Sequence, residues 1–248
     1  MGKKTISSAA RVPTTTLPVQ NPWLNISWNN TIASIDAGIL TPAYCSKNGI
    51  DITDLPGPFM GSINCSVVLL SLNPGISPCN ACFIGNAHYE KLMQDTLSHN
   101  INRHVQIYDD IWCDPNKRVL YPGCEWWRKR TQALRRAISP KPLNIFALEY
   151  FPYHTAKKIK FPPLFSDEYR DYLLEQAMND EKLIVIMRSS NDWYSIKNNG
   201  IGARLQNYAN KITLNSTINV SLTPGNMNPK DWQRLLAALS SPPTPIIP

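Results

Sequence analysis

The sequence lacks long apolar segments, and this absence excludes several classes of protein. No stretch approaches the ~18 apolar residues that a membrane-spanning helix needs, so we expect no membrane partner. Residues 1–20 contain Lys3 and Lys4 but no apolar core after them, which argues against a secretory signal. We therefore expect a cytoplasmic protein.

Charged residues are scarce as well, at 17% of the chain against 43% hydrophobic residues. A chain of this composition is too apolar and too weakly charged to be disordered throughout. Its 248 residues are enough to bury a core. One α/β domain is the natural expectation for this length, and we expect a monomer.

The six cysteines are few and unevenly spaced, which does not indicate a disulfide framework. Cys79 and Cys82 form a Cys-x-x-Cys pair that resembles half of a metal site, but the chain contains no second close pair. We therefore expect reduced thiols, no metal and no cofactor.

Positive charge is in excess, with 25 Lys and Arg against 18 Asp and Glu, a net charge of +7. This excess indicates an anionic partner, with nucleic acid favoured over acidic lipid. Four basic residues lie on one face of a predicted helix, where solvation is the default reading and phosphate contact the alternative. They are Arg128, Lys129, Arg135 and Arg136.

Both ends of the chain are polar and rich in proline. We expect residues 1–20 to be a flexible segment, residues 21–240 a single domain, and residues 241–248 a flexible Pro-rich tail.

Four short apolar runs predict buried strands, and helical patterns lie between them. The runs are 67–72, 144–150, 183–187 and 218–222. Helices are predicted over 86–97, over 125–138, after Ser166 as N-cap and after Asn228 as N-cap. This alternation predicts the α/β class: three layers (α/β/α) with a central, mainly parallel four-stranded sheet. Such sheets bind ligands at the carboxyl ends of their strands.

The segments that follow these strands resemble the motifs of the uracil-DNA glycosylase superfamily, in its Asn-Pro-Gly branch of mismatch-specific and single-strand-selective enzymes. Residues 56–61 and then Asn73-Pro74-Gly75 are similar to the first motif, while the run that ends at Glu149 is similar to the strand that reads the base. Residues 223–229 are similar to the last motif. The resemblance spans roughly residues 50–240. The alternative reading of Asn73-Pro74-Gly75 by itself is a simple β-turn.

The resemblance implies a DNA glycosylase that flips a nucleotide and needs only water as co-substrate. Asn73 would position the water. Four residues would contact the base, with Phe83 stacking on it: Leu72, Phe83, Tyr153 and His154. Five residues would contact DNA, with Met227 or Asn226 entering the base stack: Lys157, Thr223, Gly225, Asn226 and Met227. A structural histidine is the commoner role for His154, and a core or exposed loop position is the alternative for Met227.

Two residues depart from the family pattern. Ser221 stands where the last motif usually opens with a histidine that supports the leaving base, although the mismatch-specific branch also lacks that histidine. Glu149 stands where an asparagine reads uracil. An ionised carboxylate accepts from the N4 amino group of cytosine, and a protonated one donates to its N3. The alternative is a structural Glu149 in an ion pair.

Glu149 therefore favours a cytosine-type base that carries a further mark, because unmodified cytosine must be spared. We expect a 5-modified cytosine, hydroxymethylated or glucosylated, as in phage DNA; the resemblance extends to bacterial antiviral glycosylases. Three alternatives stay open: a general uracil or mismatch repair glycosylase, a non-catalytic DNA-binding module on the same fold, and an enzyme acting on free nucleotides.

Overall fold

The computed structural model describes residues 19–76, 83–100, 112–114, 119–120, 122–216 and 218–240. The expected flexible tail at 241–248, most of the expected N-terminal segment and the pair Cys79 and Cys82 lie outside these residues. None of the helices in the described ranges combines the length and the apolar content that a membrane crossing requires.

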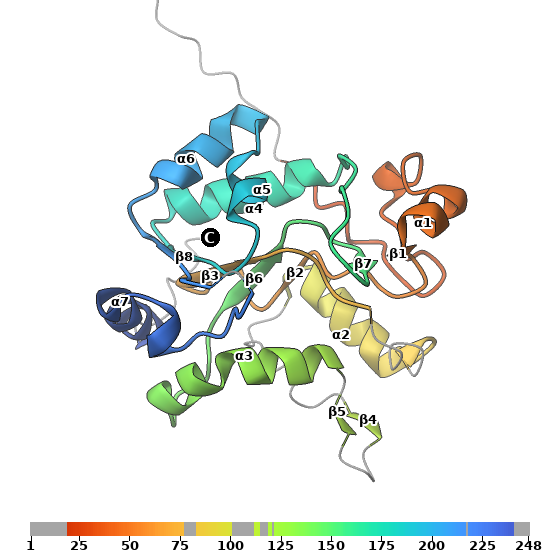
Figure 1. Ribbon diagram of the computed structural model, residues 1–248. Coiled ribbons are helices and arrows are strands. Elements are labelled where there is room, and N and C mark those ends of the chain that lie inside the picture. The colour runs from red at the N-terminus through yellow and green to blue at the C-terminus, as the bar shows by residue number, and fades with distance from the viewer. Residues whose placement is uncertain are drawn as a thin grey trace, which may run out of the picture.

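The described residues form a mixed α/β structure around a five-stranded sheet (Figure 1). The strands are β1 (Ile50–Asp51), β2 (Phe59–Met60), β3 (Val67–Ser71), β4 (Trp112–Asp114), β5 (Val119–Leu120), β6 (Phe146–Glu149), β7 (His154–Thr155), β8 (Leu183–Ile186) and β9 (Lys211–Thr213). The helices are α1 (Pro42–Asn48), α2 (Ala87–Leu97), α3 (Pro122–Ile138), α4 (Asp167–Asn179), α5 (Ser190–Tyr194), α6 (Ile201–Asn207) and α7 (Pro229–Ser240), with short 3-10 turns at Ser34–Asp36, Asn198–Gly200 and Pro224–Asn226.

The central sheet has the strand order β2-β6-β3-β8-β9, and β6, β3, β8 and β9 run parallel. The antiparallel edge strand β2 was not predicted; Gly61 follows it with φ 87°, and a Cβ there would lie 2.2 Å from the Ile145 carbonyl oxygen. The first three predicted strands are confirmed as β3, β6 and β8.

The predicted fourth strand at 218–222 is wrong, because β9 takes that place in the sheet. Val220 and Leu222 are buried, but the Leu222 N–H donates to the carbonyl of Arg130 on α3 at 2.8 Å instead of joining the sheet. The apolar residues of this segment are thus buried against a helix, and Ile218 is 87% exposed.

The sheet lies between two layers of helices, as the alternation of side chains along β3 requires. Val67 and Leu69 pack with residues of α3 and α7 on one face, and Val68 and Leu70 pack with residues of α4 and α6 on the other. Figure 1 shows α3 and α7 below the sheet and α4, α5 and α6 above it. The expected three layers are present.

The predicted helices are confirmed, with one difference at a cap. Asn86 caps α2 by accepting from the Tyr89 N–H, and Asn228 accepts from the Lys230 N–H at the start of α7. Ser166 precedes α4 as predicted, but its hydroxyl makes no capping hydrogen bond. The Asp167 carboxylate instead accepts from the Leu164 N–H at 3.1 Å.

Candidate functional site

A cavity of about 390 Å³ opens at the carboxyl ends of β3 and β6, on the face of the sheet that carries α3. Residues of α2 and α3 form its other walls. We call it the central cavity, and it is lined by Leu55, Gly57, Phe59, Met60, Ser71, Leu72, Asn73, Pro74, Gly75, Ile76, Tyr89, Met93, Gly123, Trp126, Trp127, Ala147, Glu149, His154, Thr155, Ala156, Lys157, Lys158 and Arg188. Its position follows the rule for ligands of parallel sheets.

The side-chain amide of Asn73 is held in one orientation. Its Nδ2 donates to the Pro74 carbonyl at 2.7 Å and to Oγ1 of Thr155 at 2.8 Å. A carbonyl oxygen only accepts, so Nδ2 must face Pro74 and Oδ1 must point the other way. No described residue donates to Oδ1, which leaves this acceptor available to a water molecule in the cavity.

The segment Asn73-Pro74-Gly75 extends the pairing of β3 past the end of the strand. Thr155 donates its N–H to the Pro74 carbonyl at 3.1 Å, and Gly75 forms a parallel bridge with Thr155. Thr155 thereby fixes both the backbone and the side chain beside Asn73. A simple β-turn, the alternative reading of these three residues, is not what the structure contains.

Glu149 ends β6 and lines the same cavity. Burial raises the pKa of its carboxyl to about 8, against the opposing effects of a hydrogen bond from Ser71 and the positive charge of Arg188. Its Oε2 is buried and has no hydrogen-bond partner in the described part of the chain. The raised pKa favours the protonated, neutral carboxyl near pH 7. No salt bridge joins Glu149 to another residue of the described part of the chain.

Arg188 follows β8 and lines the cavity beside Trp126. Its guanidinium carbon lies 5.9 Å from the centroid of the Trp126 ring. No carboxylate of the described residues lies within salt-bridge distance of Arg188, and its Nε is buried without a partner. The sequence places Arg188 directly after a predicted strand, in a segment that could face a ligand, but no role was predicted for it.

The residues predicted to contact the base divide into two groups. Leu72 lines the central cavity as expected. Phe83 does not line it: the ring is 4% exposed and packs on Tyr89, 5.2 Å between centroids, while Tyr89 faces the cavity. The structure therefore does not bring Phe83 to the cavity wall, where stacking on a base would need it. Tyr89, which does lie there, was not predicted.

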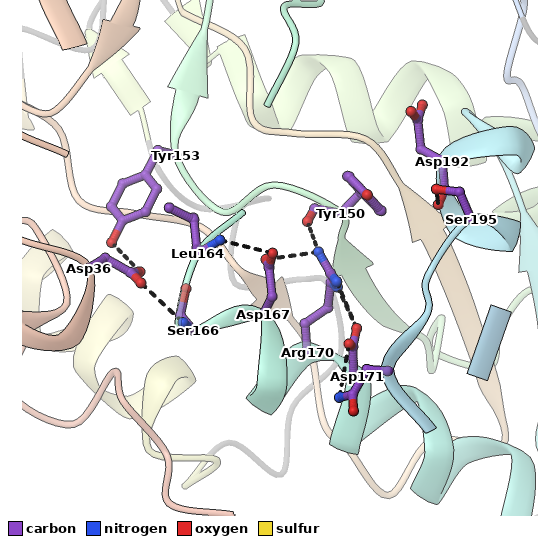
Figure 2. A network of polar contacts seen from close by, with 11 residues as sticks. Asp36, Tyr150, Tyr153, Leu164, Ser166, Asp167, Arg170, Asp171, Asp192 and Ser195 are labelled. Atoms are coloured by element: carbon purple, nitrogen blue, oxygen red, sulfur yellow. Dashed lines mark hydrogen bonds and ion pairs between the residues drawn. The ribbon is translucent and has the colours of Figure 1, made fainter. Parts of the chain in front are cut away.

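Tyr153 is also wrong as a base-contacting residue, because its side chain is fully buried in a polar network away from the cavity. Its hydroxyl donates to Oδ2 of Asp36 at 3.1 Å, and Asp36 Oδ1 accepts from the Ser166 N–H at 3.0 Å (Figure 2). Tyr153 thereby joins the N-terminal region to the start of α4.

His154 lines the cavity wall, but both of its ring nitrogens face backbone carbonyls. Nδ1 lies 2.9 Å from the Gly75 oxygen and Nε2 lies 3.0 Å from the Leu55 oxygen, with Asp54 at 3.7 Å from Nε2. A ring held on both sides is a structural histidine, which agrees with the commoner role considered from the sequence.

The backbone directly after Glu149 is clamped by Arg170 of α4. The guanidinium donates to the Tyr150 carbonyl at 2.7 Å and pairs with Asp167 and Asp171 at 2.9 and 2.7 Å (Figure 2). It also lies over the Tyr150 ring at 4.5 Å. Burial raises the pKa of Asp167 to about 6.

Two lysines lie at the wall of the central cavity. Lys157, predicted to contact DNA, is exposed and lines the cavity, and its neighbour Lys158 pairs with Asp192. On α3, Arg128 and Arg136 are exposed, Lys129 pairs with Glu125, and Arg135 donates to Thr131. Most of this basic helix face is thus open to solvent.

The segment 223–227 does not line the cavity. Met227 is 2% exposed and belongs to the core, so its expected entry into a base stack is wrong. Asn226 is wrong for the same role, because its amide donates to the carbonyls of Asn219 and Ser221 and accepts from the Ser216 N–H. Thr223 is half-buried and Gly225 is exposed.

Neither metal ligands nor disulfides occur in the described part of the chain. No group of three or more His, Cys, Asp or Glu side chains there is arranged to hold a metal ion, and Cys45, Cys65 and Cys124 are free thiols.

No protein-family model, curated protein or solved structure matches this chain.

Proposed function

We propose that this chain is a DNA glycosylase that hydrolyses the N-glycosidic bond of a modified cytosine and leaves an abasic site. The observation that carries the proposal is the presence in one cavity of a fixed amide acceptor, Asn73 Oδ1, and a buried carboxyl, Glu149, whose Oε2 has no partner among the described residues. The raised pKa of Glu149 favours its neutral form. A buried polar atom without a partner is unfavourable by ~1–3 kcal/mol, so Glu149 Oε2 would gain from a hydrogen bond to a bound base.

The reaction adds water across the bond between C1′ of the deoxyribose and N1 of the base. The electron pair of the C1′–N1 bond leaves with the base, the water oxygen bonds to C1′, and the proton released by the water ends on the base. Asn73 Oδ1 accepts a hydrogen bond from the water and aims it at C1′. An amide is a weak base, so the rate depends on placement of the water and on stabilisation of the leaving base.

The neutral Glu149 carboxyl matches the edge of cytosine. Its O–H donates to N3 while its carbonyl oxygen accepts from the N4 amino group. A neutral carboxyl also pairs with the N3–H and O4 of uracil, so the preference for cytosine is part of the proposal and requires its own test. The favoured targets are hydroxymethylated or glucosylated cytosines, as in phage DNA, which would give the enzyme a role in antiviral defence.

DNA would approach the side of the molecule on which the central cavity opens. Lys157 and the exposed face of α3 offer positive charge to phosphates. Ile218 replaces Met227 as our candidate for entering the base stack. Its neighbour Asn219 accepts from Arg130, and Arg130 lies over Trp126 of the cavity wall at 5.6 Å.

The test is incubation of the purified chain with uracil-containing DNA, unmodified DNA, and phage DNA containing glucosylated hydroxymethylcytosine, followed by alkali to convert abasic sites to breaks. The proposal expects breaks only in the modified phage DNA, and none with Asn73→Ala. Breaks only in the uracil-containing DNA would instead support a repair glycosylase. Binding without breaks in any of the three DNAs would support a non-catalytic DNA-binding module.

A further inference from the structure

Stabilisation of the leaving base requires a positive or hydrogen-bonding group, and the last motif does not supply one. Ser221, which stands where the resemblance places a histidine, does not line the central cavity. Its hydroxyl accepts from Arg130 at 3.1 Å and donates to Asn219 at 2.9 Å. The group that takes up this role must come from another strand.

Arg188 is the cationic side chain of the cavity wall that is partly buried and has no carboxylate partner among the described residues. The two lysines of the wall are exposed, and Lys158 pairs with Asp192. The Trp126 ring holds the Arg188 guanidinium without cancelling its charge. The orphaned Nε retains an unused donor.

The sheet order sets where Arg188 stands relative to the other two groups. β6 with Glu149 and β8 with Arg188 lie on opposite sides of β3, which leads into Asn73. A base whose N3 and N4 face Glu149 has O2 on the other side of N3. When the base lies with O2 toward β8, the arginine is on the side on which the negative charge of the departing pyrimidine collects.

We propose that the guanidinium of Arg188 donates to O2 of the flipped base and stabilises the negative charge that develops when the C1′–N1 bond breaks. This inference rests on the proposed glycosylase function. The electron pair of that bond moves onto N1 and is delocalised to O2, where the planar donors of arginine meet it. Because the charge is greater in the transition state than in the bound nucleotide, the contribution appears in the rate of bond cleavage.

The test compares single-turnover excision by wild type, Arg188→Gln and Arg188→Lys on oligonucleotides with cytosines of increasing leaving ability: 5-hydroxymethyl, 5-formyl and 5-fluoro. We expect Arg188→Gln to slow excision of the poorest leaving group by ~100- to 1,000-fold. The loss should shrink as the leaving group improves, and Arg188→Lys should recover part of the rate. Arg204→Gln, which changes an exposed arginine of α6 outside the cavity, should excise like wild type.

Binding separates this role from a structural one. Affinity for an oligonucleotide with a non-cleavable 2′-fluoro nucleotide should be unchanged in Arg188→Gln, and its melting temperature confirms that the variant folds. A loss of rate that is equal for every leaving group, or a loss of binding that accounts for it, would overturn the role of Arg188 and leave the glycosylase proposal standing. A wild-type chain that excises none of the bases would overturn both.

Discussion

Ser71 and Glu149 are paired residues of the adjacent parallel strands β3 and β6, and the Ser71 hydroxyl hydrogen bonds with the Glu149 carboxyl at the wall of the central cavity. The strand pairing thus holds one oxygen of the carboxyl, while Oε2 remains unpartnered in the described structure. This arrangement gives Glu149 a fixed position and a hydrogen-bonding atom that is free to contact a base.

Replacement of Asn73 by alanine should lower the single-turnover rate of base excision by ~100-fold or more, because the water loses its aligned acceptor. DNA affinity should stay at the wild-type level, since the Asn73 amide bonds only to Pro74 and Thr155 among the described residues. The matched control is Asn207→Ala on α6, an exposed amide outside the cavity. Retained excision by Asn73→Ala would remove the water-positioning role.

The rate of excision by wild type should fall as the pH rises through about 8, because the pKa of Glu149 is raised to about 8 and only the protonated carboxyl donates to N3 of cytosine. Glu149→Gln keeps a donor and an acceptor but cannot ionise, so its pH–rate profile should be flat in this range. Glu149→Ala should lose excision at every pH. A wild-type rate that increases through pH 8 would show that the carboxylate is the active form.

The same pKa shift predicts a pH-dependent stability. The folded chain holds a proton on Glu149 up to about pH 8, while the unfolded chain releases it near pH 4.5. The stability contributed by the neutral form is therefore fully present below pH 4.5 and is lost as the pH rises toward 8. Relative to wild type, Glu149→Gln should gain roughly 3 kcal/mol in free energy of unfolding between pH 5 and pH 8, measured by urea denaturation. If the free energies of unfolding of Glu149→Gln and wild type differ by the same amount at pH 5 and pH 8, Glu149 ionises normally.

Lys157→Ala should weaken binding to DNA by a similar factor whatever the DNA sequence, because in our proposal Lys157 contacts phosphate. Its side chain is exposed at the cavity wall. The slope of log affinity against log salt concentration should decrease by about 1. Lys47→Ala on α1, exposed and outside the cavity, is the control for loss of one positive charge. Equal salt slopes for wild type and Lys157→Ala would exclude a phosphate contact.

Arg170→Met should destabilise the fold by ~3 kcal/mol, because it leaves the buried carboxylate of Asp171 unpaired and releases the Tyr150 carbonyl. Arg204→Met, which breaks a more exposed ion pair with Glu175, should cost under ~1 kcal/mol. Urea denaturation measures both variants. A loss in Arg170→Met no greater than in Arg204→Met would show that the buried network contributes little.

The sequence predicted the strands that carry the site because three of them are continuous apolar runs buried on both faces, which is a strong local signal. The carboxyl-end rule then brought Asn73 and Glu149 to one cavity. β9 could not be predicted in the same way, since Lys211–Thr213 is short and has only Ile212 buried. The more apolar segment at 218–222 instead packs against α3, where the Leu222 N–H donates to the Arg130 carbonyl. No local sequence pattern indicates this contact.

The orientation of the side chains that follow β6 could not be predicted from local sequence patterns either. Tyr153 turns away from the cavity because Trp23 and Asp36 from the N-terminal region meet it, with the Trp23 and Tyr153 ring centroids 6.0 Å apart. Phe83 is likewise covered by Tyr89. The contacts of Tyr153 join residues distant in sequence, so they follow from tertiary packing alone.

The central position of β3 has a consequence for how the chain folds during its synthesis. Both strands that flank β3 come later in the sequence, β6 from Phe146 and β8 from Leu183. During synthesis β3 therefore emerges with both hydrogen-bonding edges unsatisfied, and neither closes until a long intervening segment has been translated. We therefore expect folding to be slow and to depend on non-local contacts, and we expect aggregation to be most frequent before β8 leaves the ribosome.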